Sequence, residues 1–264
     1  MKIYYKLSEI QKKKNSLLCI GLDPQIEKLP DGISKNILGI LNFNKLIIEH
    51  TNKFVCAYKM NFAFYEQFGT KGIEVLEKTL ETIPDDVLTI ADGKRSDIES
   101  TSKAYAKAIY QHFGFDCTTL NPFLGLDSLA PFFEYSEKLN FVLVCTSNPG
   151  ASDFQKLTVN NKFLYEVIAE KFYYSFVPEQ LGFVVGATNE SEFQRIREIA
   201  TNNFLLVPGI GAQGGNLDAI LNINKNRNII INVARDIIYA SKEKDFIEKV
   251  IQRTLFYCNK LQKE

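Results

Sequence analysis

The sequence lacks an excess of charge of either sign, because 31 Lys and Arg residues balance 31 Asp and Glu residues. A protein that binds mainly a nucleic-acid backbone or an anionic membrane usually carries a basic excess, so we expect neither partner. The sequence also lacks any run close to the roughly 20 apolar residues of a membrane-spanning helix. Residues 1–15 contain no apolar stretch typical of a signal peptide. These absences predict a cytoplasmic protein.

Motifs built on cysteine and histidine are missing as well. The chain has five cysteines but no Cys-x-x-Cys pair and no spacing typical of a metal site. Four of the five lie in short apolar runs, which predicts buried free thiols in a reducing compartment. The two histidines, His50 and His112, lie in stretches with a helical pattern, and there is no Gly-x-Ser-x-Gly motif. The chemistry that remains available relies on lysine and aspartate.

What the sequence does contain is a series of short apolar runs separated by amphipathic helical stretches. The runs are more continuous than alternating, which is typical of strands buried on both faces of a parallel sheet. Eight such runs alternate with helices and no interdomain linker interrupts them, so we expect an α/β fold, a single-domain (β/α)8 TIM barrel over residues 1–264. A doubly wound open sheet is the alternative. The runs are 17–23, 54–61, 88–94, 117–123, 141–147, 181–187, 204–210 and 228–234.

Charged and amide residues gather where these runs end, which is where catalytic groups lie in such barrels. Asp23 ends the first run, Lys59 and Asn61 end the second, and Asp92 and Lys94 end the third. Asp92 and Lys94 are two residues apart, so an extended strand would aim both side chains the same way. Lys59 on the neighbouring strand could complete an array of lysine, aspartate and lysine, in which opposite neighbours keep each group ionised. A simple ion pair at the strand end is the alternative.

A glycine-rich segment, 208–215, follows the seventh run. Glycines let backbone N–H groups approach an anion, and the last two loops of such barrels often hold a phosphate. Gln213 can donate an amide hydrogen bond, and Arg235, after the eighth run, can bind phosphate oxygens bidentately. A tight turn that needs positive φ would by itself explain the glycines. The fifth run ends at Ser147, whose hydroxyl and neighbouring amide suit a polar planar ring.

Taken together, these segments resemble the orotidine 5′-phosphate decarboxylase family over nearly the whole chain. The KMNF and GFVVGA segments are similar to those of one branch of that family. The D-x-K-x-x-D core is shared with Mg²⁺-dependent sugar-phosphate decarboxylases and hexulose-phosphate synthases, which are the nearest alternative. A non-catalytic barrel that binds nucleotide phosphates is a second one. The matching segments are IGLDP (20–24), YKMNFAFYEQFG (58–69), DGKRSDIEST (92–101), TSNPGA (146–151), GFVVGAT (182–188), VPGIGAQGG (207–215) and NVARDI (232–237).

The resemblance implies that orotidine 5′-monophosphate loses CO₂ to give UMP in de novo pyrimidine synthesis, with neither cofactor nor metal. It implies that Lys94, Asp92 and Lys59 form the charged array and that Lys94 protonates C6 of the pyrimidine. Asp97 and Thr101 would come from the neighbouring subunit of a homodimer. Ala234 replaces a glycine of many relatives but keeps the backbone N–H that would face phosphate. The other implied substrate contacts are Asp23 and Asn61 near the ribose, Ser147 at the pyrimidine, and Pro208, Gln213, Ala234 and Arg235 around the phosphate.

Overall fold

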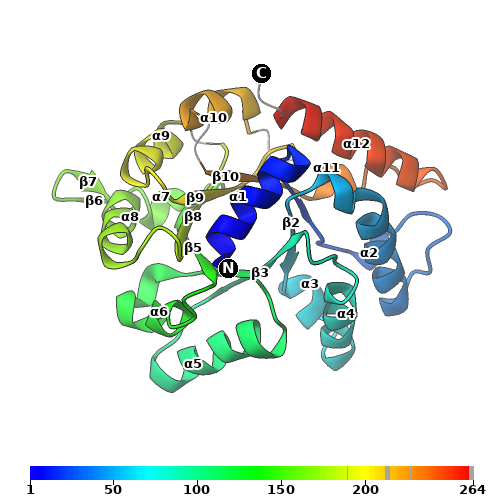
Figure 1. Ribbon diagram of the computed structural model, residues 1–264, viewed down its shortest axis with the longest axis horizontal. Coiled ribbons are helices and arrows are strands. Elements are labelled where there is room, and N and C mark those ends of the chain that lie inside the picture. Colours follow the sequence, from blue (N-terminus) through cyan, green and yellow to red (C-terminus); the bar gives the residue numbers. More distant parts are fainter. Residues whose placement is uncertain (189, 212–214, 226–227, 262–264) are drawn as a thin grey trace. The chain divides into compact units, whose positions relative to one another are not determined.

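The structure is a computed structural model that describes residues 1–188, 190–211, 215–225 and 228–261, and its main sheet is a closed parallel barrel (Figure 1). The strand order is β1-β10-β9-β8-β5-β4-β3-β2. Each strand lies within or overlaps one of the predicted runs, so the barrel prediction is confirmed. The barrel strands are β1 (Leu18–Gly21), β2 (Ala57–Asn61), β3 (Leu88–Arg95), β4 (Cys117–Leu120), β5 (Leu139–Cys145), β8 (Leu181–Val185), β9 (Phe204–Pro208) and β10 (Ile229–Val233).

Helices follow the strands along the chain, and a short antiparallel hairpin of β6 (Thr158–Val159) and β7 (Lys162–Phe163) lies between α7 and α8. The helical segment after β3 begins as the α-helix Glu99–Lys107 and ends as a π-helical turn, Ala108–His112. The α-helices are α1 (Ile3–Lys14), α2 (Ile37–Thr51), α3 (Ala63–Glu66), α4 (Thr70–Leu80), α5 (Glu99–Lys107), α6 (Leu126–Phe133), α7 (Ala151–Phe154), α8 (Leu164–Ser175), α9 (Glu190–Ile199), α10 (Leu217–Asn224), α11 (Arg235–Ile238) and α12 (Phe246–Leu261).

The chain packs as two compact units, residues 1–8 with 94–232 and residues 9–93 with 233–264. All five cysteines are buried free thiols, as predicted. In the part of the chain that the structure describes, no helix combines the length and apolar character that a membrane crossing requires. The single-domain assignment stays a prediction.

The unit of residues 9–93 and 233–264 contains β1, β2 and most of β3. In the parallel register Gly21 lies opposite Lys59, and Asn61 lies opposite Asp92. This register brings the polar carboxyl ends of the three strands to the same edge. Helix α2 begins at Asn36, whose side-chain oxygen accepts a hydrogen bond from the Gly39 N–H at 2.9 Å, a typical N-cap.

The unit of residues 1–8 and 94–232 contains a core of large aromatic side chains between β5, β8 and β9. Gly182 on β8 is needed there, because a Cβ atom would lie 2.6 Å from the Phe141 ring and 2.8 Å from the Phe204 carbonyl oxygen. The hydroxyl of Tyr4 donates to the Asn202 carbonyl at 2.8 Å and accepts from Asn228 Nδ2 at 2.7 Å. The first turn of α1 is therefore tied to the segments that precede β9 and β10.

A fully buried arginine holds the loops at the same end of this unit. Arg197 on α9 is 1% exposed, and its guanidinium donates to the carbonyls of Ala200 (2.8 Å), Asn203 (3.0 Å) and Asn228 (2.7 Å). Buried backbone carbonyls need donors, and a planar guanidinium supplies several at once.

We expect Arg197→Met to lower the free energy of unfolding by about 3 kcal/mol or more, because it leaves buried carbonyls without donors that cost about 1–3 kcal/mol each. Urea unfolding measures the change. Arg195→Met, two residues away on the same helix, is the matched control: its side chain is 52% exposed and pairs with Glu166 at 3.0 Å, so we expect little change. Equal stability of the Arg197 variant and the wild type would contradict the assignment.

Candidate active site

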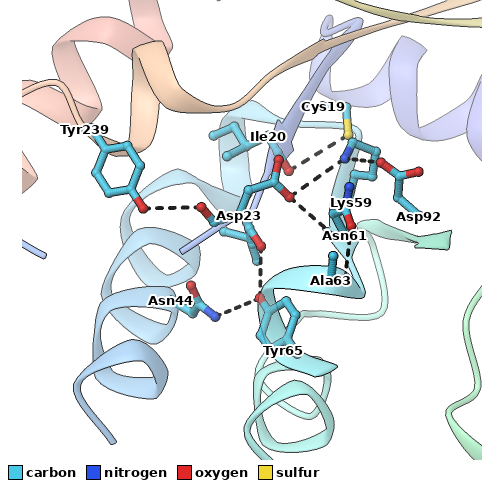
Figure 2. Close-up of polar contacts among 11 residues, drawn as sticks. Cys19, Ile20, Asp23, Asn44, Lys59, Asn61, Ala63, Tyr65, Asp92 and Tyr239 are labelled. Carbon is cyan, nitrogen blue, oxygen red and sulfur yellow. Dashed lines mark hydrogen bonds and ion pairs between the residues drawn. The ribbon is translucent and has the colours of Figure 1, made fainter. Parts of the chain in front are cut away.

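A buried lysine lies between two carboxylates at the ends of the first three strands (Figure 2). Lys59 Nζ is 2.7 Å from Asp92 Oδ2 and 3.8 Å from Asp23 Oδ1. Lys59 is 5% exposed and Asp92 is 7% exposed. Lys59 lies in β2, Asp92 lies in β3 and Asp23 follows β1, so the strand register that buries the apolar runs also assembles the charges.

The surroundings of Lys59 keep its ammonium group protonated. Burial by itself lowers the pKa of Lys59, but the carboxylates of Asp23 and Asp92 outweigh it, so the pKa lies above its usual value. The structure therefore places Lys59 beside Asp92 and adds Asp23 as a second carboxylate. The array that also includes Lys94 stays a prediction. The Lys59 ammonium cannot serve as a base at neutral pH, so its role is electrostatic.

Asn61 lies beside this cluster and supports its backbone. The Asn61 N–H donates to Asp23 Oδ1 at 3.3 Å, while the Asn61 side-chain oxygen accepts from the Ala63 N–H at 3.1 Å (Figure 2). The second contact begins the short helix α3. The main chain of Asn61 thus orients Asp23, and its side-chain oxygen is engaged in a local turn.

The backbone at Lys94 differs from the extended strand that the sequence predicts. Lys94 has a φ of 47°, its side chain is exposed, and its N–H donates to Thr119 Oγ1 on β4 at 3.1 Å. A left-handed residue turns its Cα–Cβ bond away from the direction that strand alternation would give. The expectation that Asp92 and Lys94 point the same way from an extended strand was therefore based on the wrong backbone geometry. Non-glycine residues with positive φ are costly and cluster at functional sites.

Asp97 and Thr101 lie beyond β3, where α5 begins. Asp97 Oδ1 accepts a hydrogen bond from the Ile98 N–H at 2.8 Å, and Thr101 is exposed in the first turn of α5. Ile98 between them is 59% exposed. These residues are on the surface of their unit.

Ser147 is held indirectly, through its neighbour Thr146. The Thr146 N–H donates to Gln155 Oε1 at 2.8 Å, and Gln155 Nε2 donates to Thr146 Oγ1 at 2.8 Å. Gly186, after β8, approaches the Ser147 backbone so closely that a Cβ would lie 2.8 Å from the Ser147 nitrogen. The loop after β5 is thus packed against the loop after β8.

The described part of the glycine-rich segment combines positive φ angles with close packing of the backbone. Gly209 and Gly211 have φ values of 99° and 86°, and a Cβ at Gly215 would lie 2.6 Å from Ala187 Cβ. Pro208 ends β9, and its carbonyl accepts from the Ala187 N–H at 2.9 Å. Positive φ at these glycines agrees with the turn requirement. Gln213 lies outside the described residues.

Ala234 and Arg235 begin the short helix α11 after β10. The Ala234 carbonyl accepts from the N–H groups of residues 237 and 238, and the Arg235 side chain is exposed. The next residue, Asp236, accepts from Arg253 Nε at 2.7 Å and from the Tyr257 hydroxyl. Helix α12 therefore holds the turn that presents Arg235.

Sequence reasoning missed the residues that hold these turns. Tyr239 contacts the backbone next to Asp23, and Tyr65 contacts the backbone of Leu22. The available signal for Tyr239 was its place four residues after Arg235, just beyond the NVARDI segment. Among the residues that the structure describes, no group of three or more His, Cys, Asp or Glu side chains is placed to hold a metal ion.

The Lys59 cluster makes the stability of the protein depend on pH in a defined direction. The pKa of Lys59 is higher in the folded protein than in the unfolded chain, where it is about 10.4. The stabilisation that the Lys59 ammonium gives the folded state is therefore complete below about pH 10.4, and it is lost as pH rises from there toward the folded-state pKa. We expect Lys59→Met to lower the free energy of unfolding by about 3–5 kcal/mol near pH 7, because it removes the ammonium that offsets the charges of Asp23 and Asp92. The difference from wild type should stay constant up to about pH 10 and shrink above it.

Lys14→Met is the control, because burial of Lys14 outweighs the attraction of Asp86 and lowers the pKa of Lys14. The wild type should therefore gain stability relative to Lys14→Met as pH rises toward the pKa of lysine in the unfolded chain. This pH trend is opposite to the one expected for Lys59→Met. Urea unfolding between pH 7 and 11 measures both. A Lys59→Met difference that grows with pH would contradict the charge arrangement.

Known proteins share both sequence and fold with this chain. Residues 16–250 match the model of the orotidine 5′-phosphate decarboxylase / HUMPS family. An orotidine 5′-phosphate decarboxylase of Dehalococcoides mccartyi is 46% identical over 255 residues, which cover 94% of this chain and 93% of that protein. One of Christiangramia forsetii is 44% identical over 248 residues, with coverages of 92% and 91%.

Solved structures give the same result. The OMP decarboxylase of Leishmania donovani has a TM-score of 0.87 and 33% identity, covering 99% of this chain and 97% of that one. The UMP synthase of the same organism has a TM-score of 0.89 and 35% identity, covering 99% of this chain, which spans 56% of the synthase. With a family match over most of its length and relatives of this similarity, the chain belongs to the orotidine 5′-phosphate decarboxylase / HUMPS family.

Proposed function

We propose that this protein is an orotidine 5′-phosphate decarboxylase, which converts orotidine 5′-monophosphate to UMP and CO₂ without a cofactor. The observation that carries the proposal is the buried Lys59–Asp92 pair at 2.7 Å, beside Asp23, in a chain of this family. The name of the curated relatives at 44–46% identity supports the same activity. The cytoplasmic location and the absence of a nucleic-acid partner stay predictions.

The reaction requires the protein to stabilise negative charge. The bond between C6 and the carboxylate carbon breaks, its electron pair stays on C6, and CO₂ leaves. A proton from the Lys94 ammonium then forms the C6–H bond of UMP, and solvent returns the proton to the lysine. The pyrimidine offers no good sink for the electron pair, so preorganised positive charge must lower the barrier.

Repulsion between Asp92 and the substrate carboxylate contributes as well, but it is too small to act alone. Two like charges 4 Å apart interact by about 4 kcal/mol at an effective dielectric of 20. Enzymes lower barriers by roughly 8–23 kcal/mol. Binding energy from the distant phosphate, at Arg235 and Gln213, supplies a further part by ordering the site around the substrate.

The remaining contacts follow the ends of the barrel strands. We assign Asp23 and Asn61 to the ribose, because they adjoin the Lys59 cluster. Ser147 follows β5 and faces the pyrimidine in this proposal. We assign these residues to the phosphate: Pro208, Gln213, Ala234 and Arg235. Pro208 ends β9, and Arg235 begins α11.

We propose further that the active unit is a homodimer in which Asp97 and Thr101 complete the neighbouring subunit's site. Three exposed apolar side chains support this arrangement: Ile98 is 59%, Phe123 80% and Leu124 49% exposed. Their loops, after β3 and β4, are joined by a hydrogen bond from the Asn121 N–H to the Arg95 carbonyl at 3.1 Å. Clustered exposed apolar side chains mark protein interfaces.

Lys94→Ala should lower the rate at saturating substrate by about 10²–10⁴-fold or more, because it removes the proton donor. Loss of the orotate absorbance band on incubation with orotidine 5′-monophosphate measures the rate. Lys45→Ala, an exposed lysine on α2, is the matched control and should retain the wild-type rate.

Two outcomes would overturn this assignment. A near-wild-type rate for Lys94→Ala would show that another group protonates C6. A wild-type activity that EDTA abolishes and Mg²⁺ restores would favour the metal-dependent members of the wider family.

Mixing Asp97→Ala with Lys94→Ala chains should restore about a quarter of the wild-type activity, because half of a randomly mixed symmetric dimer population is mixed and each such dimer has one intact site. Refolding or subunit exchange followed by the absorbance assay measures the recovery. Mixing Lys94→Ala with Asp92→Asn chains is the control. Each chain then carries a defect in the array that it contributes itself, so neither site of a mixed dimer is intact. Absence of recovery in the first mixture would argue against a site shared between subunits.

A further inference from the structure

Two tyrosine hydroxyls hold the backbone that presents Asp23 (Figure 2). Tyr65 donates to the Leu22 carbonyl at 2.9 Å. Tyr239 donates to the Asp23 carbonyl at 3.2 Å and accepts from the Gln25 N–H at 2.7 Å. The Tyr239 hydroxyl therefore satisfies a carbonyl and an N–H that are two residues apart. Both ends of the turn that carries the Asp23 carboxylate are thus fixed by one side chain.

The side chain of Tyr239 is held in place by its neighbours. Its ring stacks on the Phe43 ring, with centroids 5.9 Å apart and an interplanar angle of 13°, and Lys28 Nζ lies 5.6 Å from its centroid. Burial raises the pKa of Tyr239, so its hydroxyl keeps the proton that it donates to Asp23. A rigid ring with a protonated hydroxyl suits a fixed support better than a flexible side chain.

The main chain of Tyr239 belongs to the turn that presents Arg235. The Tyr239 N–H donates to the Arg235 carbonyl at 3.1 Å and closes helix α11. The same helix is held from α12 through the contact of Asp236 with Arg253. Tyr239 therefore contacts the Arg235 turn through its backbone and the Asp23 turn through its side chain. Tyr65 instead bonds to Leu22 and Asn44, so it supports the backbone next to Asp23.

We propose that Tyr239 is a positioning residue that couples the Arg235 turn to the Asp23 turn, so that phosphate binding and ribose recognition reinforce each other. This inference rests on the proposed function, which assigns the phosphate to Arg235 and the ribose hydroxyls to Asp23. Tyr239 itself need not touch the substrate. Removal of the Tyr239 hydroxyl should weaken the interaction between Asp23 and the ribose hydroxyls. This loss of affinity should be larger when Arg235 is intact.

Tyr239→Phe tests the proposal, because it keeps the ring that stacks on Phe43 and removes both hydroxyl hydrogen bonds. We expect the variant to bind UMP about tenfold more weakly, the order expected for losing such hydrogen bonds. Its affinity for 2′,3′-dideoxyuridine 5′-phosphate, which lacks the hydroxyls assigned to Asp23, should change by less than about twofold. Calorimetric titration or competitive inhibition measures both affinities.

A double-mutant cycle with Arg235→Gln tests the coupling. In the Arg235→Gln background, Tyr239→Phe should weaken UMP binding by less than it does in the wild type. Tyr4→Phe is the matched control, because the Tyr4 hydroxyl also donates to a carbonyl and accepts from an N–H, but before β9 and β10. It should leave the affinities for both nucleotides unchanged.

Equal losses of affinity for UMP and the dideoxy nucleotide, or additive effects of the Tyr239 and Arg235 changes, would overturn the coupling. If wild-type protein binds UMP but does not decarboxylate orotidine 5′-monophosphate, the proposed function fails while the coupling can still hold. If Tyr239→Phe does not fold, hydrogen exchange of the wild-type protein tests the coupling instead. Inorganic phosphate should then slow exchange of the Gln25 amide, and no change in that amide would overturn the proposal.

Discussion

The interaction on which the rest of this site depends is the burial of the Lys59 ammonium between Asp23 and Asp92. An isolated buried charge is very costly, and a buried ion pair is tolerated only with close partners. The ends of β1, β2 and β3 must therefore meet at one edge, in the register that places Asn61 opposite Asp92. The apolar parts of these strands supply that register, because Leu18–Gly21, the first four residues of β2 and the first five of β3 are buried. The same strand packing that stabilises the fold thus brings Lys59, Asp23 and Asp92 together.

Around this cluster, the backbone departs from regular structure where the proposed chemistry needs it. Lys94 adopts a positive φ at the end of β3, and Gly209 and Gly211 do so after β9. A left-handed lysine is strained, and such strain persists where surrounding contacts hold it in place. Here the Lys94 N–H is held by the Thr119 hydroxyl of β4. Regular strands provide rigidity, and short irregular segments aim the groups that meet a ligand.

The supports of these segments are as specific as the charged residues themselves. Gln155 fixes Thr146 beside Ser147, α12 fixes Asp236 beside Arg235, and Tyr239 fixes the backbone of Asp23. In each case a side chain from one element bonds to a residue at or next to a proposed substrate contact. This arrangement fixes the backbone at or beside the proposed substrate contacts before a ligand binds, which lowers the ordering cost of binding.

The sequence by itself determined the eight strands and the closeness of Lys59 to Asp92, because continuous apolar runs and the charges near their ends are local patterns. That Asp23 also contacts Lys59 came only from the structure. It predicted the wrong backbone at Lys94, since no local pattern distinguishes the last extended residue from a left-handed one. It also missed Tyr65 and Tyr239, whose rings look like ordinary core residues in a sequence. The bond between Gln25 and Tyr239 joins residues 214 positions apart. Only the tertiary structure could decide such contacts, because a hydroxyl's partners depend on which loops the folded chain brings together, not on the residues beside it.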